Sequence, residues 1–229
     1  FGVSQMFHPA IHEAFAQTLT GERPPVFWVQ GQGCTGCSVT LLNSTHPSIA
    51  DVLLKIISLE FHPTVMAAEG EGAYEHMMRV AEKFKGKFIF AVEGAVPVAH
   101  DGKCCVVAEA NHHEVTMTEV TKVLAANAAA VLAVGTCAAY GGIPAGKGNE
   151  TGAMGVSAFL KKEGIPAPVI NIPGCPPHPD WIVGTIGLGL QALATNTLGL
   201  LVKQGLDANG RPKAFYKNCL LYTSDAADD

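Results

Sequence analysis

The feature that most constrains this chain is the regular alternation of short apolar runs with longer segments that show helical periodicity. The apolar runs, rich in β-branched and aromatic residues, cover residues 25–30, 87–94, 129–135 and 168–173. Strands that alternate with helices pair in parallel, and the connecting helices cover both faces of the sheet. The sequence therefore predicts an α/β fold with a mostly parallel sheet and helices on both faces.

The remaining elements are expected between and after these strands. Residues 63–69 are expected to form a second strand or a strand end, and residues 103–109 belong to a short hairpin. The expected helices cover residues 48–59, 73–84, 114–127 and 152–164, and a last helix opens at residues 178–184.

Length, composition and charge narrow the class of protein. The chain has 229 residues, of which 48% are hydrophobic, so it can bury one substantial core. It has 15 basic against 20 acidic residues and no basic cluster, which argues against a nucleic-acid-binding protein. The uncharged run Trp181–Val202 is long enough to cross a bilayer. Polar residues interrupt it and Pro179 and Asp180 precede it, so we expect a buried helix of a folded domain, and contact with a membrane is at most peripheral.

Cysteines follow three of the predicted strands. Cys34 and Cys37 come after the first strand, Cys137 after the strand at 129–135, and Cys175 after the strand at 168–173. In a parallel α/β sheet, ligands bind beyond the carboxyl ends of the strands, where the strand order reverses. The sequence therefore predicts that four thiols gather at one edge of the sheet.

The stretch Gly31–Gly36 also spells GxGxxG, the pattern of a dinucleotide-binding loop. That pattern requires a long helix after the last glycine and an acidic residue at the end of the next strand. Here His46 and Pro47 cut the helix short, and Glu60 is expected to precede its strand. Dinucleotide binding also gives no role to the cysteines. We therefore expect these glycines to bring backbone N–H groups close to a metal cluster.

Three chemistries could use the four thiols. Disulfides are disfavoured because the chain has seven cysteines and a core that needs no covalent support. Structural zinc prefers two compact cysteine pairs, whereas an iron-sulfur cluster accepts one CxxC pair with two distant single ligands. The spacing favours the cluster and leaves zinc open.

Other cysteines and histidines are expected to have no ligand role. Cys104 and Cys105 are adjacent in a predicted strand, where their side chains point to opposite faces, so we expect small buried thiols. His8 and His12 lie four residues apart without a third ligand. His112 and His113 are expected to be solvated at the start of a helix.

Four motifs together resemble a known family. They are GCTGCSVTLLNSTHPSIADVLLKIISLEFHPTVMAAEGE, FIFAVEGAVP, VGTCAAYGGIPA and INIPGCPPHPDW, and they occur in the family's order. From about residue 25 to residue 216, the chain resembles the small subunit of nickel-iron hydrogenases, closest to the nickel-iron-selenium branch.

The resemblance implies a flavodoxin-like domain and specific ligands. Cys34, Cys37, Cys137 and Cys175 would hold one proximal 4Fe-4S cluster, beside a large subunit that carries the nickel-iron centre. Glu93 matches a family carboxylate near the subunit interface, with a role in a proton path or at that interface. A carboxylate that caps the loop beside Gly94 is the alternative for Glu93.

The resemblance also implies a function shared between two subunits. The holoenzyme splits hydrogen or forms it, and this chain carries electrons to or from an external carrier such as a c-type cytochrome, in the periplasm. No acid–base pair, nucleophile or open metal site in the sequence indicates catalysis by this chain alone. One alternative is the cluster-bearing subunit of an NADH:quinone oxidoreductase-like complex, although its first loop has adjacent cysteines. A zinc-stabilised interaction module is the other.

The resemblance further divides the chain into four segments. Residues 1–24 are expected to form an N-terminal extension without a visible leader, and residues 25–200 the flavodoxin-like domain. Residues 201–218 would begin the connection to a C-terminal cluster domain whose ligands are missing here. Residues 219–229, which include Cys219, do not resemble the family.

Overall fold

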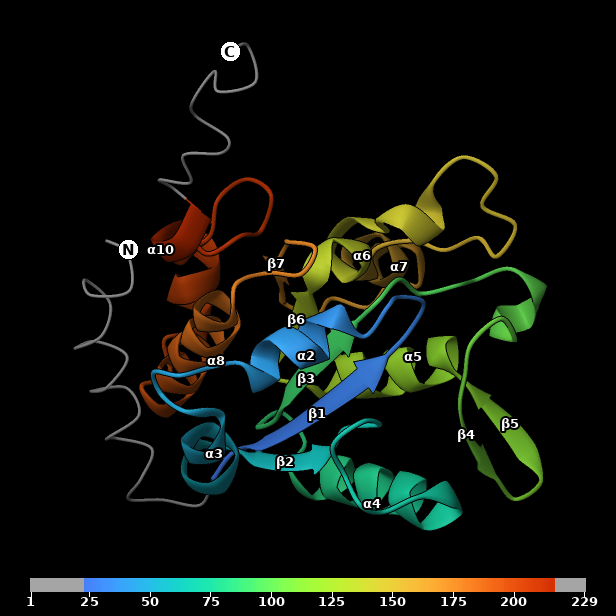
Figure 1. The fold of residues 1–229 in the computed structure, drawn as a ribbon, viewed down its shortest axis with the longest axis horizontal. Coiled ribbons are helices and arrows are strands. Elements are labelled where there is room, and N and C mark those ends of the chain that lie inside the picture. The colour runs from blue at the N-terminus through green and yellow to red at the C-terminus, as the bar shows by residue number, and fades with distance from the viewer. Residues whose placement is uncertain (1–22, 217–229) are drawn as a thin grey trace.

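The computed structural model describes residues 23–216, and a parallel five-stranded sheet lies at its centre with helices on both faces (Figure 1). The strand order is β2-β1-β3-β6-β7, and every neighbouring pair is parallel. This is the flavodoxin-like order, in which the direction of winding reverses between β1 and β3. The predicted α/β fold is therefore confirmed. The strands are β1 (Pro25–Gln30), β2 (Ser58–Phe61), β3 (Ile89–Glu93), β6 (Ala130–Val134) and β7 (Val169–Ile172).

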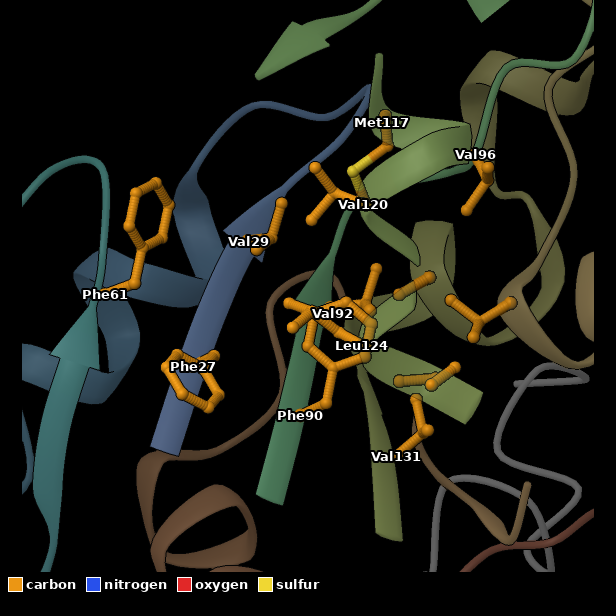
Figure 2. Close-up of a cluster of buried hydrophobic side chains, with 14 of the residues drawn as sticks. Phe27, Val29, Phe61, Phe90, Val92, Val96, Met117, Val120, Leu124 and Val131 are labelled. Carbon is orange, nitrogen blue, oxygen red and sulfur yellow. The ribbon is translucent and has the colours of Figure 1, made fainter. Parts of the chain in front are cut away.

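Helices cover the two faces of the sheet in two groups. On one face, side chains of β1, β3 and β6 pack with α4, α5 and α7, and Figure 2 shows side chains of these strands and of α5 from this cluster. On the other face, the alternate side chains of the same strands pack with η1 and α8. Both faces are buried, which explains why the strands are continuous apolar runs in the sequence. The helices and helical turns are α2 (Gly36–Leu42), α3 (Ile49–Asp51), η1 (Val52–Ile56), α4 (Gly70–Lys83), η2 (His100–Gly102), α5 (Met117–Asn127), α6 (Gly135–Tyr140), η3 (Ile143–Ala145), α7 (Val156–Lys162), α8 (Pro179–Ala194), α9 (Leu198–Leu200), η4 (Leu201–Gly205) and α10 (Lys213–Tyr216).

The second strand is placed differently from the prediction. The helix expected over 48–59 ends at Ile56, and β2 occupies Ser58–Phe61, while residues 63–69 form turns and a loop. Glu60 therefore lies within a strand, so that part of the argument against a dinucleotide site was wrong. The other part is confirmed, because α2 ends at Leu42. Sequence periodicity missed this boundary because the apolar residues of η1 run directly into those of β2.

The hairpin after β3 consists of β4 (Val106–Ala110) and β5 (His113–Thr116), as expected. Cys104 and Cys105 precede β4 instead of lying within it, and both are half-buried. His113 belongs to β5, so the histidine pair does not open a helix. α5 begins only at Met117, where the Thr116 side chain and Glu119 form a capping box. His8, His12 and Cys219 lie outside the described residues.

The long uncharged run near the C-terminus is interrupted, and its first part is a buried helix. α8 ends at Ala194, and most of its residues are buried. His178 caps its first turn, and Pro179 is its first residue, as the sequence predicted. None of the helices in residues 23–216 combines the length and the apolar character needed to cross a bilayer.

The register of the sheet aligns the ends of four strands in one row. Gln30 pairs with Glu93, Glu93 with Val134, and Val134 with Ile172. The chain segments that leave this row therefore start side by side. Three of these segments, those after β1, β6 and β7, contain the four cysteines singled out by the sequence.

Candidate functional site

The four cysteines lie within a few residues of the row of strand ends. Cys34 is exposed in the loop after β1, and Cys37 is half-buried in the first turn of α2. Cys137 is half-buried in α6, directly after β6, and Cys175 is exposed in the loop after β7. Glu93 is the last residue of β3. The structure thus places all five predicted residues at the carboxyl edge of the sheet.

Neighbouring charges shift the pKa values of two of the four thiols. Burial and, after it, the charges of Glu93, Cys34, Cys137 and Cys175 together raise the pKa of the Cys37 thiol to about 12. Burial also raises the pKa of Cys137, with added contributions from Cys175, Cys34 and Glu93. The Ile143 backbone N–H donates to the Cys137 sulfur and opposes this shift. The shifts of Cys37 and Cys137 thus both include contributions from Cys34 and Cys175.

Direct contacts join the three loops that contain these cysteines. Thr136 N–H donates to the Gly174 carbonyl at 2.9 Å, and Gly174 N–H donates to the Thr136 hydroxyl at 3.1 Å. A Cβ atom built on Gly135 would lie 2.4 Å from the Cys37 sulfur and 3.7 Å from the Gly174 oxygen. Gly135 also has a φ of 87°, which side chains rarely adopt. A glycine is therefore required where the loops after β1, β6 and β7 meet.

Glu93 is buried beneath the Cys37 loop, with 3% of its surface exposed. Its Oε1 accepts the N–H groups of Cys37 at 3.0 Å and of Ser38 at 3.2 Å. Its Oε2 accepts the Trp28 indole N–H at 2.9 Å, the Gln30 side-chain amide at 3.3 Å and the Ser38 hydroxyl. Five donors point at two oxygens, an arrangement that suits an ionised carboxylate, which accepts hydrogen bonds and donates none.

The sequence analysis missed a buried serine and histidine that extend this network. The Ser38 hydroxyl lies 3.2 Å from His62 Nε2, and the Thr64 N–H donates to His62 Nδ1 at 3.2 Å. These bonds assign the neutral ring with its proton on Nε2. Burial lowers the pKa of His62, and its ring stacks on Trp28 at 5.4 Å between centroids. His62 directly follows β2, so the rule that found the cysteines would have found it had the strand been placed correctly.

Of the glycines after β1, Gly31 plays a different part from the one predicted. Gly31 N–H donates to the Glu93 carbonyl at 2.7 Å, so it does not point toward the thiols. A Cβ atom on Gly31 would lie 2.5 Å from the Ala95 oxygen. This glycine therefore permits close approach between the backbones that continue β1 and β3, where the winding reverses.

The remaining described cysteines are separate from the site. Cys105 packs against the core on the α4 and α5 face, and its sulfur lies 3.9 Å from the Gln30 carbonyl. Burial and the neighbouring Cys104 raise its pKa. Neither cysteine contributes to the pKa shift of Cys37 or Cys137.

The chemistry of the four cysteine sulfurs indicates which metal groups they could bind. Four cysteine sulfurs are soft ligands that suit zinc or an iron-sulfur cluster. A zinc ion needs its thiolates at about 2.3 Å from one point. Within residues 23–216, no three His, Cys, Asp or Glu side chains converge closely enough to hold a single ion. Four cysteine sulfurs on loops that leave one edge of the sheet are a ligand set that an iron-sulfur cluster can use.

Comparison with known proteins gives the family. The chain is 52% identical over 220 residues to the periplasmic NiFeSe hydrogenase small subunit of Desulfomicrobium baculatum, covering 94% of this chain and 69% of that protein. This chain belongs to the family of hydrogenase small subunits. It is also 39% identical over 172 residues to the hydrogenase-2 small chain of Escherichia coli K12, covering 75% of this chain but only 44% of that protein.

Solved structures agree with this membership of the hydrogenase small subunits. A structure of the NiFeSe hydrogenase from Desulfovibrio vulgaris Hildenborough matches with a TM-score of 0.84 and 65% identity, over 92% of this chain and 77% of that one. A family model described as NADH ubiquinone oxidoreductase, 20 Kd subunit, matches residues 34–188. That model covers the segment with the four cysteines, so the two redox families weighed from the sequence share this fold.

The different environments of the cysteines predict an order of reactivity in this hydrogenase small subunit. In metal-free protein at pH 8, iodoacetamide should modify the exposed Cys34 and Cys175 first. Cys37 should react slowest, because its pKa of about 12 leaves the thiol protonated. Peptide mass spectrometry over a time course measures each rate, and raising the pH to 10 should speed Cys37 by about a hundredfold if the fold persists. Equal rates at the four positions would contradict the described packing.

Proposed function

We propose that this chain is the electron-transfer subunit of a nickel-iron-selenium type hydrogenase and that Cys34, Cys37, Cys137 and Cys175 hold one 4Fe-4S cluster. The observation that carries the proposal is the placement of four cysteines just beyond one row of strand ends, on three loops that contact one another through Gly135, Thr136 and Gly174. When bound, a cluster of this kind accepts and releases single electrons. The nickel-iron centre belongs to a large partner subunit, because the cysteines form a closed set without an open catalytic position.

The residues around the thiols would prepare them for the cluster. Half-burial of Cys37 and Cys137 keeps water away from the inner side of the site. Their raised pKa values mean that they release protons when metal binds, so loading is favoured as the pH rises. The Ile143 N–H directed at the Cys137 sulfur is the kind of hydrogen bond that adjusts a cluster's potential.

We assign Glu93 as a positioning residue. It connects the first turn of α2, which contains Cys37, to Trp28 and Gln30 on β1. Because Glu93 is buried and accepts the N–H groups of Cys37 and Ser38, its place is beneath the cysteine loop. Among the roles considered from the sequence, this one is closest to a carboxylate that caps a loop. Glu93 accepts N–H groups of the loop that contains Cys37, however, and not those of the loop beside Gly94.

Exposed apolar side chains beside the cysteines support a partner subunit at this edge. Val39 and Leu42 on α2 are 56% and 39% exposed, and Ile143, the first residue of η3, is 86% exposed. The segments that position Cys37 and Cys137 thus also present apolar surface. We propose that the large subunit covers this edge and that an external carrier, such as a c-type cytochrome, completes the electron path. The name of the Desulfomicrobium relative supports a periplasmic location.

The ligand assignment predicts which cysteines hold iron. After anaerobic reconstitution, the parent chain should contain about four irons and show the paramagnetic resonance signal of a reduced cubane. Serine at any of the four proposed ligands should remove iron or leave a degraded cluster. Serine at Cys104, Cys105 or Cys219 should leave the iron content unchanged. Zinc without iron in the parent would replace the proposal with the structural-metal alternative.

Two separate glycine substitutions test the close packing around Cys37 without changing a proposed ligand. Gly135→Ala places a methyl group against the Cys37 sulfur, whereas Gly148→Ala has an equivalent φ of 88° but nothing within 4 Å. Both variants have backbone strain, so only Gly135→Ala should lose iron. Equal iron in the two variants would mean that the contact with Cys37 does not matter for loading.

The positioning role predicts the effect of Glu93→Gln. The new amide NH₂ group faces the donors of Trp28 and Gln30, so a buried N–H loses its acceptor, at a cost of about 1–3 kcal/mol in the free energy of unfolding. Glu163→Gln, which breaks the exposed ion pair with Lys122, should cost less than about 1 kcal/mol. Urea unfolding of the metal-free variants measures both. Equal losses would contradict the central place of Glu93.

The partner proposal predicts that the pure chain shows no hydrogen uptake and that the heterodimer does. Ile143→Glu places a charge in the proposed contact and should weaken binding to the large subunit by about tenfold or more. Leu54→Glu is the matched control, because Leu54 is 71% exposed in η1, next to the amino end of β2. Binding is measured by co-purification and by titration. Hydrogen uptake by the pure chain, or equal binding of both variants, would overturn the proposal.

A further inference from the structure

The segment after α8 returns to the sheet and contacts the loop that contains Cys175. Leu206, Phe215 and Tyr216 are buried in the same core cluster as β6, β7 and α8. Figure 1 shows this C-terminal segment, in red, beside α8. The segment Leu206–Tyr216 is called the brace below.

The tip of the brace attaches to the outer edge of β7. Asn171 N–H donates to the Gly210 carbonyl at 2.8 Å, and the Asn171 side-chain amide donates to the Asn209 carbonyl at 2.7 Å. β7 is an edge strand, so these bonds satisfy backbone groups that would otherwise be unpaired.

An aspartate and an arginine hold the turn at this tip. Asp207 Oδ1 accepts the N–H groups of Asn209 and Arg211, each at 2.9 Å, and Oδ2 accepts the Arg211 guanidinium at 2.7 Å. Both side chains are mostly buried, at 24% and 22% exposure, so the pair is better shielded from solvent than a surface ion pair.

The other end of the brace reaches the loop before Cys175. The Tyr216 hydroxyl donates to the Pro173 carbonyl at 2.7 Å in a buried hydrogen bond. The Tyr216 ring packs edge-on against Trp181 in the first turn of α8, at 4.8 Å between centroids. The Arg211 guanidinium lies over the same ring at 5.4 Å. The tyrosine is therefore held from three sides and has little freedom to move its hydroxyl.

The Cys175 loop is thus held on two sides by hydrogen bonds. Thr136, next to Cys137, binds both backbone groups of Gly174, and Tyr216 binds the carbonyl of Pro173. Cys175 itself is exposed and follows directly. An exposed ligand gains little positional restraint from packing, so the hydrogen bonds of the two residues before it set its position.

We infer that Tyr216 is a positioning residue for Cys175 and that the brace couples the C-terminal part of the chain to occupancy of the thiol site. This inference rests on the proposed function. Coupling works in both directions, so loading the site should also stabilise the brace. A merely structural tyrosine would stabilise the fold without making the exchange of residues 206–216 depend on loading.

The test compares Tyr216→Phe with the parent in the full 229-residue chain after anaerobic reconstitution. Tyr216→Phe removes only the hydroxyl, and loss of iron to a chelator should become about fivefold faster, the effect of one buried hydrogen bond. Tyr74→Phe on α4, which packs on the opposite face, is the matched control and should lose iron at the parental rate. Asp207→Asn loosens the tip of the brace and should act in the same direction as Tyr216→Phe.

Amide hydrogen exchange with and without iron provides the second readout. In the parent and in Tyr74→Phe, loading should slow exchange in residues 206–216, and in Tyr216→Phe this difference should shrink. A parent chain that takes up no iron would refute the proposed function. Suppose instead that the parent holds about four irons and that Tyr216→Phe matches it in both the rate of iron loss and the hydrogen exchange. That result would refute the inference about the brace and leave the proposed function in place. If Tyr216→Phe does not fold, Asp207→Asn decides, and parental behaviour in that variant would overturn the inference.

Discussion

Parallel pairing of β1, β3, β6 and β7 in one register is the constraint on which the site depends. Because Gln30, Glu93, Val134 and Ile172 form a single row, the chain leaves the sheet at four neighbouring points. A shift of one residue in β3 would turn Glu93 to the opposite face, away from Trp28 and the Cys37 loop. The two buried faces prevent such a shift, since it would also expose the apolar residues that pack against α4, α5 and α8.

The thiol site is supported from beneath by a buried carboxylate that no described cation neutralises. Burying a charge is costly unless hydrogen bonds replace the lost water, and five donors surround the two oxygens of Glu93. Two of these donors are backbone N–H groups in the first turn of α2, so the carboxylate also satisfies groups that a helix leaves unpaired. The network continues through Ser38 to His62, which links the turn after β2 to the same site.

The loops that contain the cysteines hold one another by backbone contacts. Gly135 lets the Cys37 sulfur approach the chain after β6, and Thr136 joins that chain to Gly174. Tyr216 adds a contact from a segment more than forty residues away in sequence. The positions of the thiols at this site are therefore a property of several loops together.

Much of this molecule could be predicted from the sequence alone, because alternation of apolar runs and helical segments is a local signal. That signal identified the parallel α/β fold, and the rule on strand ends selected Cys34, Cys37, Cys137 and Cys175 for one edge. It failed where two apolar elements adjoin, at η1 and β2, and so His62 was missed. Only the tertiary structure decided the partners of Glu93, the contact between Gly135 and Cys37, and the attachment of Tyr216 to Pro173. These depend on register and on chain segments that meet across long sequence separations, and local periodicity contains no information about such distances.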